Sequence, residues 1–239
     1  MKNALKKLLN KPLKHFGYRI ADERNIHDET SLVQRLKEMG FRPQSVVDVG
    51  VAHGTPYLYH GFPDAHFFLF DPTEESLPHM KWWAEKIDAE VFNIALGAED
   101  STMKIKTRDT IQHATLLEDT TKPELETSYD VEVKQLDNLD ITLTEPCLAK
   151  IDVEGFELDV LKGMRRTAKK IDLVIIETSL ASLYNGGAST REILNFMDSM
   201  DFRPVDIAGI TRRPRDNMIH QIDFVFARKG TAPYAKSWS

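Results

Sequence analysis

The stretch that most constrains the fold reads LAKIDVEGFELDVL, residues 148–161. A short apolar run ends at Asp152 and Glu154, and a helical pattern follows directly. A carboxylate at the end of a strand, just before a crossover helix, is typical of open α/β sheets, which bind ligands at the carboxyl ends of their strands. Two more acidic strand ends precede it, in VVDVGVAHG (46–54) and LFDP (69–72). The pattern predicts a nucleoside-type cofactor beside a reaction site.

Strand-like and helix-like patterns alternate from residue 45 onward. Five apolar runs have the length of strands: 45–49, 66–70, 90–94, 147–151 and 172–176. Helical patterns lie between several of them: 74–86, 156–168 and 190–200. Several runs are apolar on both pleat faces, as in parallel strands that helices cover on both sides. These features predict a doubly wound α/β sheet.

Two further strand patterns, 203–207 and 222–227, close the sequence. The polar link between them, 208–220, is too poor in apolar residues for a covering helix, so we expect the last strand to run antiparallel. The alternating segments 103–107 and 131–135 predict an additional hairpin between the third and fourth strands.

The composition is that of an ordinary soluble globular protein, with 41% apolar and 28% charged residues among 239. We divide the chain into a helical extension, residues 1–44, and one domain, residues 45–239. The net charge of −6 gives no support for a nucleic-acid partner. Without a transmembrane run or a signal peptide, the expected compartment is the cytoplasm. The lysine-rich start, 2–14, fits a helix docked on the domain or a helix that touches an anionic membrane surface.

A glycine-rich turn follows the run at 45–49. Asp48, Gly50 and Gly54 form D-x-G-x-x-x-G, and such glycines let the backbone turn sharply and approach a ligand closely. The dinucleotide fingerprint has a glycine where Asp48 stands and a third glycine for helix packing. A ligand without a pyrophosphate fits better, so we predict S-adenosylmethionine, with Asp48 near its ammonium group, directly or through water. His53 is expected to pack against the cofactor or the turn.

Two more strand ends fit a nucleoside. Asp71 lies about 20 residues beyond Gly50, the offset at which an acidic residue accepts hydrogen bonds from ribose hydroxyls. The third strand runs into NIALG (93–97), where Ile94 and Ala95 are placed to flank an adenine ring. Asp71 also precedes a proline, so a helix cap is the alternative explanation for it.

Six stretches together resemble the FkbM family of S-adenosylmethionine-dependent methyltransferases: VVDVGVAHG, FLFDP, NIALG, KIDVEGFELDVLKG, IIET and QIDFVFARKG. The resemblance covers about residues 45–228, and KIDVEGFELDVLKG (150–163) is its most specific part. It implies a seven-stranded methyltransferase sheet with an antiparallel last strand. It also implies methylation of a hydroxyl on a sugar, a glycan precursor, a polyketide or another small metabolite. The family usually has Ala-Asn after the first glycine, where this chain has Val51 and Ala52, and Glu in place of Asp71.

Three carboxylates mark the ends of neighbouring strands, Asp152, Glu154 and Glu177. In an in-line methyl transfer, an aliphatic hydroxyl needs a general base or a cation that stabilises the developing alkoxide. One carboxylate serves as the base, or Asp152 and Glu177 bind Mg²⁺, Mn²⁺ or Ca²⁺, which favour oxygen ligands; both alternatives stay open. Lys150 shares a pleat face with Asp152 and is expected to pair with it. Glu157 is explained by helix-start electrostatics.

The remaining candidates lie in polar loops. His220, just before the last strand, and His113, in the long loop, are candidates for proton transfer, and His113 is also a candidate for acceptor binding. A surface or loop histidine without a role in the reaction is the alternative for each. Tyr184, beside paired glycines, is expected to shape the acceptor site. Arg212 and Arg213 are candidates for binding an anionic group of the acceptor through bidentate guanidinium contacts, with a solvated charge run as the alternative.

Two functions of other classes are the alternatives to this one. A methyltransferase-like domain without activity would act as a binding or scaffold module, because fold does not fix function. Intact Asp48, Gly50, Asp71 and Asp152 disfavour it. A nicotinamide dehydrogenase is disfavoured by the missing glycine of the fingerprint.

Overall fold

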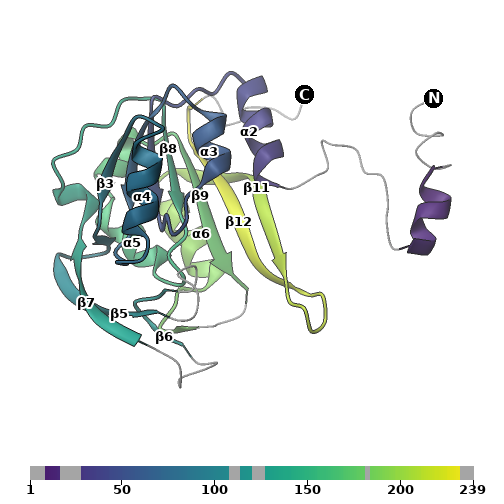
Figure 1. Ribbon diagram of the computed structural model, residues 1–239. Coiled ribbons are helices and arrows are strands. Elements are labelled where there is room, and N and C mark those ends of the chain that lie inside the picture. The colour runs from purple at the N-terminus through teal and green to yellow at the C-terminus, as the bar shows by residue number, and fades with distance from the viewer. Residues whose placement is uncertain (1–8, 17–27, 108–113, 120–126, 181–183, 232–239) are drawn as a thin grey trace.

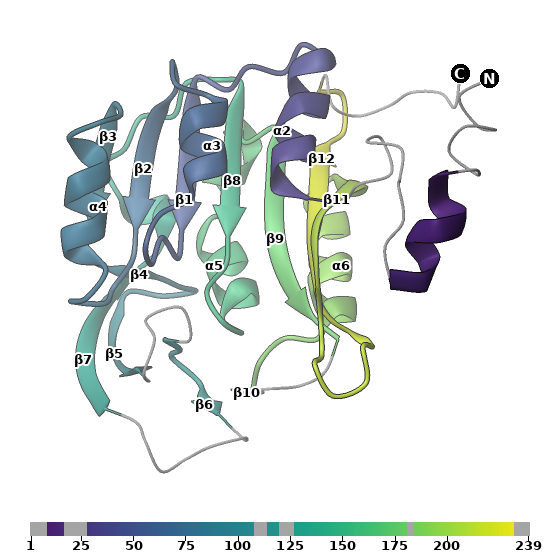
Figure 2. The same cartoon turned by 45° about the vertical axis from the view of Figure 1, so that its right-hand side comes forward.

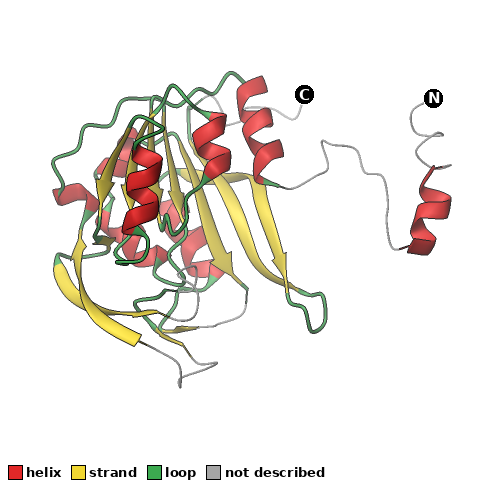
Figure 3. Ribbon diagram, in the orientation of Figure 1, coloured by secondary structure: helices red, strands yellow, loops and turns green. Residues whose placement is uncertain are grey.

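The main element of the fold is a seven-stranded sheet (Figures 1 and 3). The computed structural model describes residues 9–16, 28–107, 114–119, 127–180 and 184–231. From edge to edge the strands are β11 (Phe202–Arg212), β12 (Ile219–Arg228), β9 (Leu173–Ser179), β8 (Cys147–Ile151), β1 (Ser45–Val49), β2 (His66–Phe70) and β3 (Ala89–Phe92). β12 runs antiparallel to both neighbours, and the other adjacent pairs of this sheet are parallel. The predicted antiparallel last strand is confirmed.

Helices cover both faces of this sheet, as Figure 2 shows. One face carries α2 (Glu29–Glu38), α3 (Pro56–Gly61) and α4 (Leu77–Ala84), and the other carries α5 (Glu157–Gly163) and α6 (Thr190–Ser199). Each face has its own buried cluster, with Leu36 and Met80 in the first and Val160 and Ile193 in the second. The structure also describes three short 3₁₀ helices, η1 (Lys14–Phe16), η5 (Leu136–Asn138) and η6 (Thr167–Lys170), and α-helical residues 9–13. The predicted doubly wound α/β fold is confirmed.

A smaller sheet lies at the carboxyl ends of the central strands (Figure 2). It is formed by β4 (Ala95–Leu96), β7 (Thr127–Lys134) and β5 (Ser101–Thr107), in that order. β5 and β7 pair antiparallel, so the predicted additional hairpin is present. Two further short strands, β6 (Glu118–Asp119) and β10 (Tyr184–Asn185), pair with each other and join two loops that are distant in sequence.

The link between the last two strands is shorter than the sequence predicted. β11 continues to Arg212 and β12 begins at Ile219, so only residues 213–218 connect them. Ile210 pairs with Ile222, which continues the ladder through residues whose polarity suggested a loop. Polar residues are tolerated here because β11 is an edge strand. The six-residue helix α3 was not predicted, because it is too short to show a helical period.

The N-terminal extension contributes to the core of the domain. Leu32, Val33 and Leu36 of α2 are buried in one cluster with Val46 of β1. Phe16, in the preceding described segment, is 72% exposed. No helix in the described part of the chain is long and apolar enough to span a membrane. The domain boundary at residue 45 stays a prediction.

Gly163, the last residue of the KIDVEGFELDVLKG stretch, allows α5 to pack directly on the backbone. A Cβ atom on Gly163 would lie 1.9 Å from the carbonyl oxygen of Gly97. We expect Gly163→Ala to lower the free energy of unfolding by about 1–3 kcal/mol, because the backbone has to move. Lys162 is the exposed neighbour of Gly163, and Lys162→Ala should change the free energy of unfolding by no more than about 0.5 kcal/mol. Urea denaturation measures both, and equal midpoints would contradict the close contact.

Candidate active site

A cavity of about 500 Å³ lies at the carboxyl ends of β1, β2, β8 and β9. Its lining contains nine of the predicted catalytic and cofactor-binding residues, Gly50, His53, Gly54, Asp71, Ile94, Ala95, Asp152, Glu154 and Glu177, and also Lys150, the predicted partner of Asp152. Ile105 of β5 and Leu116 also line it, so the smaller sheet and its adjoining loop contribute one wall. The structure brings the glycine turn and the acidic strand ends around one space, and the chemical role of each residue stays a prediction.

The two glycines of the turn are needed for contacts within the protein. Gly50 has a φ of +80°, and a Cβ atom there would lie 1.7 Å from the carbonyl oxygen of Asp152. Gly54 has a φ of +116°, and a Cβ atom there would lie 2.0 Å from Nε1 of Trp83. The Trp83 indole N–H donates to the His53 carbonyl at 3.0 Å. Gly50 thus allows the glycine turn to pack against the turn between β8 and α5, and Gly54 allows the glycine turn to pack against α4.

Asp71 organises the neighbouring loops from the end of β2. Its Oδ2 accepts a hydrogen bond from the N–H of Ala52 at 2.8 Å, which ties β2 to the glycine turn. Its Oδ1 accepts from the N–H and hydroxyl of Thr73 and from the hydroxyl of Ser76, at 2.9, 2.6 and 2.6 Å. Oδ2 accepts one bond and keeps capacity for a second, so a ribose contact and a loop-capping role are compatible.

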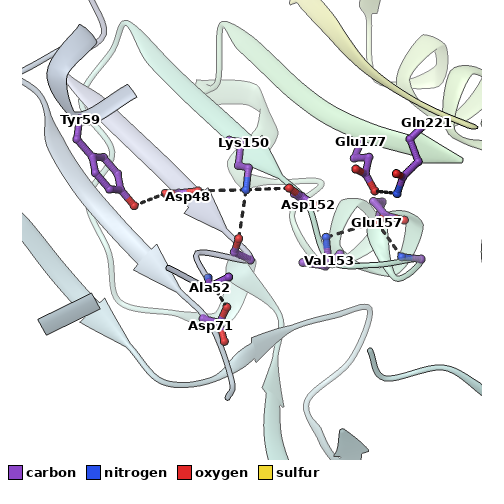
Figure 4. A network of polar contacts seen from close by, with 12 residues as sticks. Asp48, Ala52, Tyr59, Asp71, Lys150, Asp152, Val153, Glu157, Glu177 and Gln221 are labelled. Atoms are coloured by element: carbon purple, nitrogen blue, oxygen red, sulfur yellow. Dashed lines mark hydrogen bonds and ion pairs between the residues drawn. The ribbon is translucent and has the colours of Figure 1, made fainter. Parts of the chain in front are cut away.

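Lys150 connects three parts of the site (Figure 4). Its Nζ donates to the carbonyl oxygen of Gly50 at 3.1 Å and lies 3.2 Å from Oδ2 of Asp152 and 3.9 Å from Oδ1 of Asp48. Burial favours the neutral amine, but the charges of Asp152 and Asp48 outweigh it and raise the pKa of Lys150. The side chain is therefore an ammonium group, and its predicted pairing with Asp152 is present.

Asp48 lies beneath the cavity and does not line it. The carboxylate is fully buried, and its Oδ2 accepts a hydrogen bond from the hydroxyl of Tyr59 at 2.6 Å. Burial raises the pKa of Asp48, while the charge of Lys150 and the bond from Tyr59 oppose that rise. The residue predicted to approach the cofactor ammonium therefore points toward Tyr59 and Lys150, because β1 directs it to the α3 side of the sheet.

Glu177 differs chemically from the other two carboxylates. Burial, followed by the charges of Asp152 and Glu154, raises the pKa of Glu177 to about 10. Gln221 of β12 donates from Nε2 to its Oε1 at 2.5 Å. Glu177 is therefore a protonated acid near neutral pH. One oxygen each of Asp152, Glu154 and Glu177 lie within 4.8 Å of one another, a spacing that would also allow them to hold a metal ion.

Several residues at the site escaped the sequence analysis. Tyr59 and Gln221 are missed because the first lies in an unpredicted short helix and the second is one polar residue among many in β12. Thr115 donates from its hydroxyl to the carbonyl of Glu154 at 2.8 Å, a contact without a sequence signal. Glu157 is buried and accepts from the N–H of Gly155 at 2.9 Å, which goes beyond helix-start electrostatics.

The predicted acceptor-binding arginines do not line the cavity. The guanidinium group of Arg212 donates to the carbonyl of Asn217 at 2.9 Å, and that of Arg213 pairs with Asp216 at 2.9 Å. Both therefore stabilise the turn between β11 and β12. Thr211, beside them, does line the cavity.

The other loop candidates are placed only in part. His220 lies in β12, does not line the cavity, and has a buried Nδ1 without a hydrogen-bond partner among the described residues. The backbone of Tyr184 pairs with Asp119 between β10 and β6. His113 lies outside the described residues.

If the glycine turn binds the cofactor, a substitution that disturbs the close contact between Gly50 and Asp152 should weaken cofactor binding. Gly50→Ala should weaken the affinity for S-adenosylhomocysteine at least about tenfold, because the added methyl group displaces the turn. Gly40→Ala is the matched control, since Gly40 has nearly the same φ, +81°, and open space around it. Calorimetric titration measures both, and equal affinities would contradict the assignment of the turn to the cofactor.

The raised pKa of Glu177 predicts how stability depends on pH. Its folded-state value of about 10 lies above its ordinary value of 4.5, so the folded protein holds this proton more tightly than the unfolded chain. That stabilisation is complete below about pH 4.5 and is lost as the pH rises toward about 10. Glu177→Gln should therefore stabilise the protein more at pH 9 than at pH 5. Urea denaturation at both values tests this, and an equal effect would contradict it.

Comparison with known proteins identifies the family. The model of the methyltransferase FkbM domain matches residues 48–204. The chain is 24% identical over 208 residues to the hexuronic acid methyltransferase AglP of Haloferax volcanii, covering 86% of this chain and 79% of that protein. The crystal structure of methyltransferase FkbM from Methylobacillus flagellatus KT aligns with a TM-score of 0.50 and 18% identity, over 76% of this chain and 43% of that one. Because the family match covers well over half of the sequence, the protein belongs to the FkbM family of S-adenosylmethionine-dependent methyltransferases.

Proposed function

We propose that this methyltransferase methylates a hydroxyl group of a sugar or a similar small polyhydroxylated acceptor, with Asp152 as the general base. The main support is the position of Asp152. Its side chain is 38% exposed and lines the cavity, and one of its oxygens lies 3.2 Å from the ammonium group of Lys150. An ion pair with a buried ammonium group orients the carboxylate toward a bound acceptor.

The cavity fits the cofactor of the family. The glycine turn would hold the amino-acid end, Asp71 the ribose, and the apolar Ile94 and Ala95 the adenine ring. The support in the structure is the spare capacity of the Asp71 Oδ2 atom, together with the apolar wall beside it. When bound, S-adenosylmethionine supplies an electrophilic methyl group on a sulfonium. Asp48 would not touch the cofactor, and would act on this site only through its charge beside Lys150.

The carboxylates divide the acid and base roles. Asp152 would accept the proton of the acceptor hydroxyl, and the hydroxyl oxygen would take the methyl group that bound S-adenosylmethionine supplies, with S-adenosylhomocysteine as the leaving group. Glu177, protonated because burial and neighbouring charges raise its pKa to about 10, donates a hydrogen bond to a second acceptor oxygen. Glu154, on the adjoining turn, lines the same space. Two hydrogen-bonding groups directed at neighbouring oxygens suit a ring with adjacent hydroxyls.

The class of acceptor is supported by a relative. The protein AglP, whose name describes a hexuronic acid methyltransferase, aligns with 86% of this chain. A sugar is therefore favoured over a polyketide-type metabolite.

Metal-assisted methylation is the second candidate. One oxygen each of Asp152, Glu154 and Glu177 lie within 4.8 Å of one another, and an all-oxygen set suits Mg²⁺ or another hard divalent cation. A cation there would bind the acceptor oxygen and stabilise its developing negative charge. Asp152 and Glu177 would then both be ligands, so their substitution would have similar effects.

The test is a methyl-transfer assay on the full chain with deuterium-labelled S-adenosylmethionine. Hexuronates and neutral hexoses, free and glycosidically linked, are offered as acceptors, and products are identified by mass spectrometry. We expect Asp152→Asn to lower kcat by about 10²–10⁴-fold, the usual contribution of a general base. The kcat of Glu177→Gln should stay within about threefold of the wild-type kcat, because glutamine resembles the protonated acid and keeps a hydrogen-bond donor.

Controls separate the alternatives. If Asp152 is the general base, activity persists in EDTA. Metal-assisted methylation would be favoured if activity is lost in EDTA and recovered in Mg²⁺, and if Asp152→Asn and Glu177→Gln lose activity equally. Wild-type activity of Asp152→Asn would refute its role as base. Absence of S-adenosylhomocysteine binding by calorimetry would favour the scaffold function.

A further inference from the structure

The turn between β8 and α5 holds two cavity carboxylates on a strained backbone. Glu154 and Gly155 have φ values of +51° and +100°. The left-handed conformation costs a residue other than glycine about 1–2 kcal/mol, so neighbouring contacts have to stabilise it at Glu154. Turns with successive N–H groups on one side also form small concavities that bind anions.

The hydrogen-bond acceptor at this turn is the side chain of Glu157. Its Oε1 accepts hydrogen bonds from the N–H of Gly155 at 2.9 Å and from the N–H of Val153 at 3.4 Å (Figure 4). The side chain is 4% exposed and does not line the cavity. Burial raises the pKa of Glu157 to about 7, and the bond from Gly155 opposes that rise. The carboxylate thus contacts the backbone of the turn from the side of α5.

The turn is also held at Asp152, whose N–H donates to the carbonyl of Val49 at 3.0 Å and whose side chain pairs with Lys150 at 3.2 Å. Two further contacts belong to segments around the cavity. The hydroxyl of Thr115 donates to the carbonyl of Glu154 at 2.8 Å. The carbonyl of Asp152 packs against Gly50 so closely that a Cβ atom would lie 1.7 Å away. Glu157 alone among these contacts anchors the turn to a helix of the main domain. A shift of the N–H groups that it binds moves Asp152 and Glu154 relative to the glycine turn.

We propose that Glu157 is a positioning residue for methyl transfer, holding the 152–155 turn so that Asp152 and Glu154 face the acceptor. The proposal rests on the proposed role of Asp152. It gives Glu157 no contact with either substrate, so its loss lowers turnover and leaves cofactor affinity unchanged.

Three substitutions and one control test this in the full chain. Glu157→Ala removes the acceptor of both N–H groups. Glu157→Asp keeps the carboxyl group on a side chain that is shorter by one methylene. Glu157→Gln keeps an acceptor oxygen on a side chain of the same length. Asp159→Ala is the control, because Asp159 lies on the same helix and pairs with Lys162 at 3.0 Å on the surface. Each variant is measured for kcat, for KM of the acceptor, for S-adenosylhomocysteine affinity, and for hydrogen exchange at the Gly155 amide.

We expect kcat to fall about 10- to 100-fold in Glu157→Ala and Glu157→Asp, since small displacements of reacting groups have effects of this size. Affinity for S-adenosylhomocysteine should stay within about threefold, and Glu157→Gln should recover most of kcat. The Gly155 amide should exchange faster in Glu157→Ala than in wild type.

Wild-type kcat in a folded Glu157→Ala or Glu157→Asp variant would overturn the proposal, and so would unchanged exchange at Gly155. Equal losses of kcat and S-adenosylhomocysteine affinity would also overturn it, because they indicate a general structural role. Should Glu157→Ala not fold, Glu157→Asp decides. The exchange measurement needs no turnover, so it separates failure of this proposal from failure of the proposed function.

Discussion

A largely buried ammonium group joins the glycine turn to the carboxylates at the ends of the neighbouring strands. Lys150, on the central strand β8, reaches the carbonyl of Gly50 in one turn and the carboxylate of Asp152 in the next. A buried charge is costly when a partner is lost, so these contacts have to persist together. The close approach of Gly50 to the Asp152 carbonyl joins the same two turns through the backbone. These contacts therefore join the two turns into one unit.

Carboxylates that look alike in the sequence become different groups on this unit. Asp152 pairs with a cation, Glu177 is protonated through burial and the neighbouring charges, and Glu157 is enclosed by backbone amides. The surroundings of each carboxyl group, rather than its residue type, therefore determine whether it is an ion-paired carboxylate, a protonated acid or an acceptor for backbone N–H groups. These differences arise because the carboxyl groups lie close together at the ends of β8 and β9.

The sequence predicts the central sheet well, because buried parallel strands are continuous apolar runs. β1, β2 and β8 begin and end at the predicted residues. The cavity also collects most of the predicted residues, because strand ends of a parallel sheet share one edge. The partners of each side chain were harder to predict. Arg213 pairs with Asp216, three residues away, and nothing in the sequence distinguishes that local contact from a contact with an acceptor.

The bond between Tyr59 and Asp48 has a consequence for how such chains diverge. Asp48 is fully buried, and the hydroxyl of Tyr59 satisfies one of its oxygens. A chain that lost the hydroxyl alone would keep a carboxylate oxygen in the interior without its donor. One that lost the acid alone would leave the hydroxyl without its acceptor and Lys150 without one of its two neighbouring negative charges. We therefore expect a change at one of the two positions to be tolerated only with a change at the other, although Asp48 lies on β1 and Tyr59 on the covering helix α3.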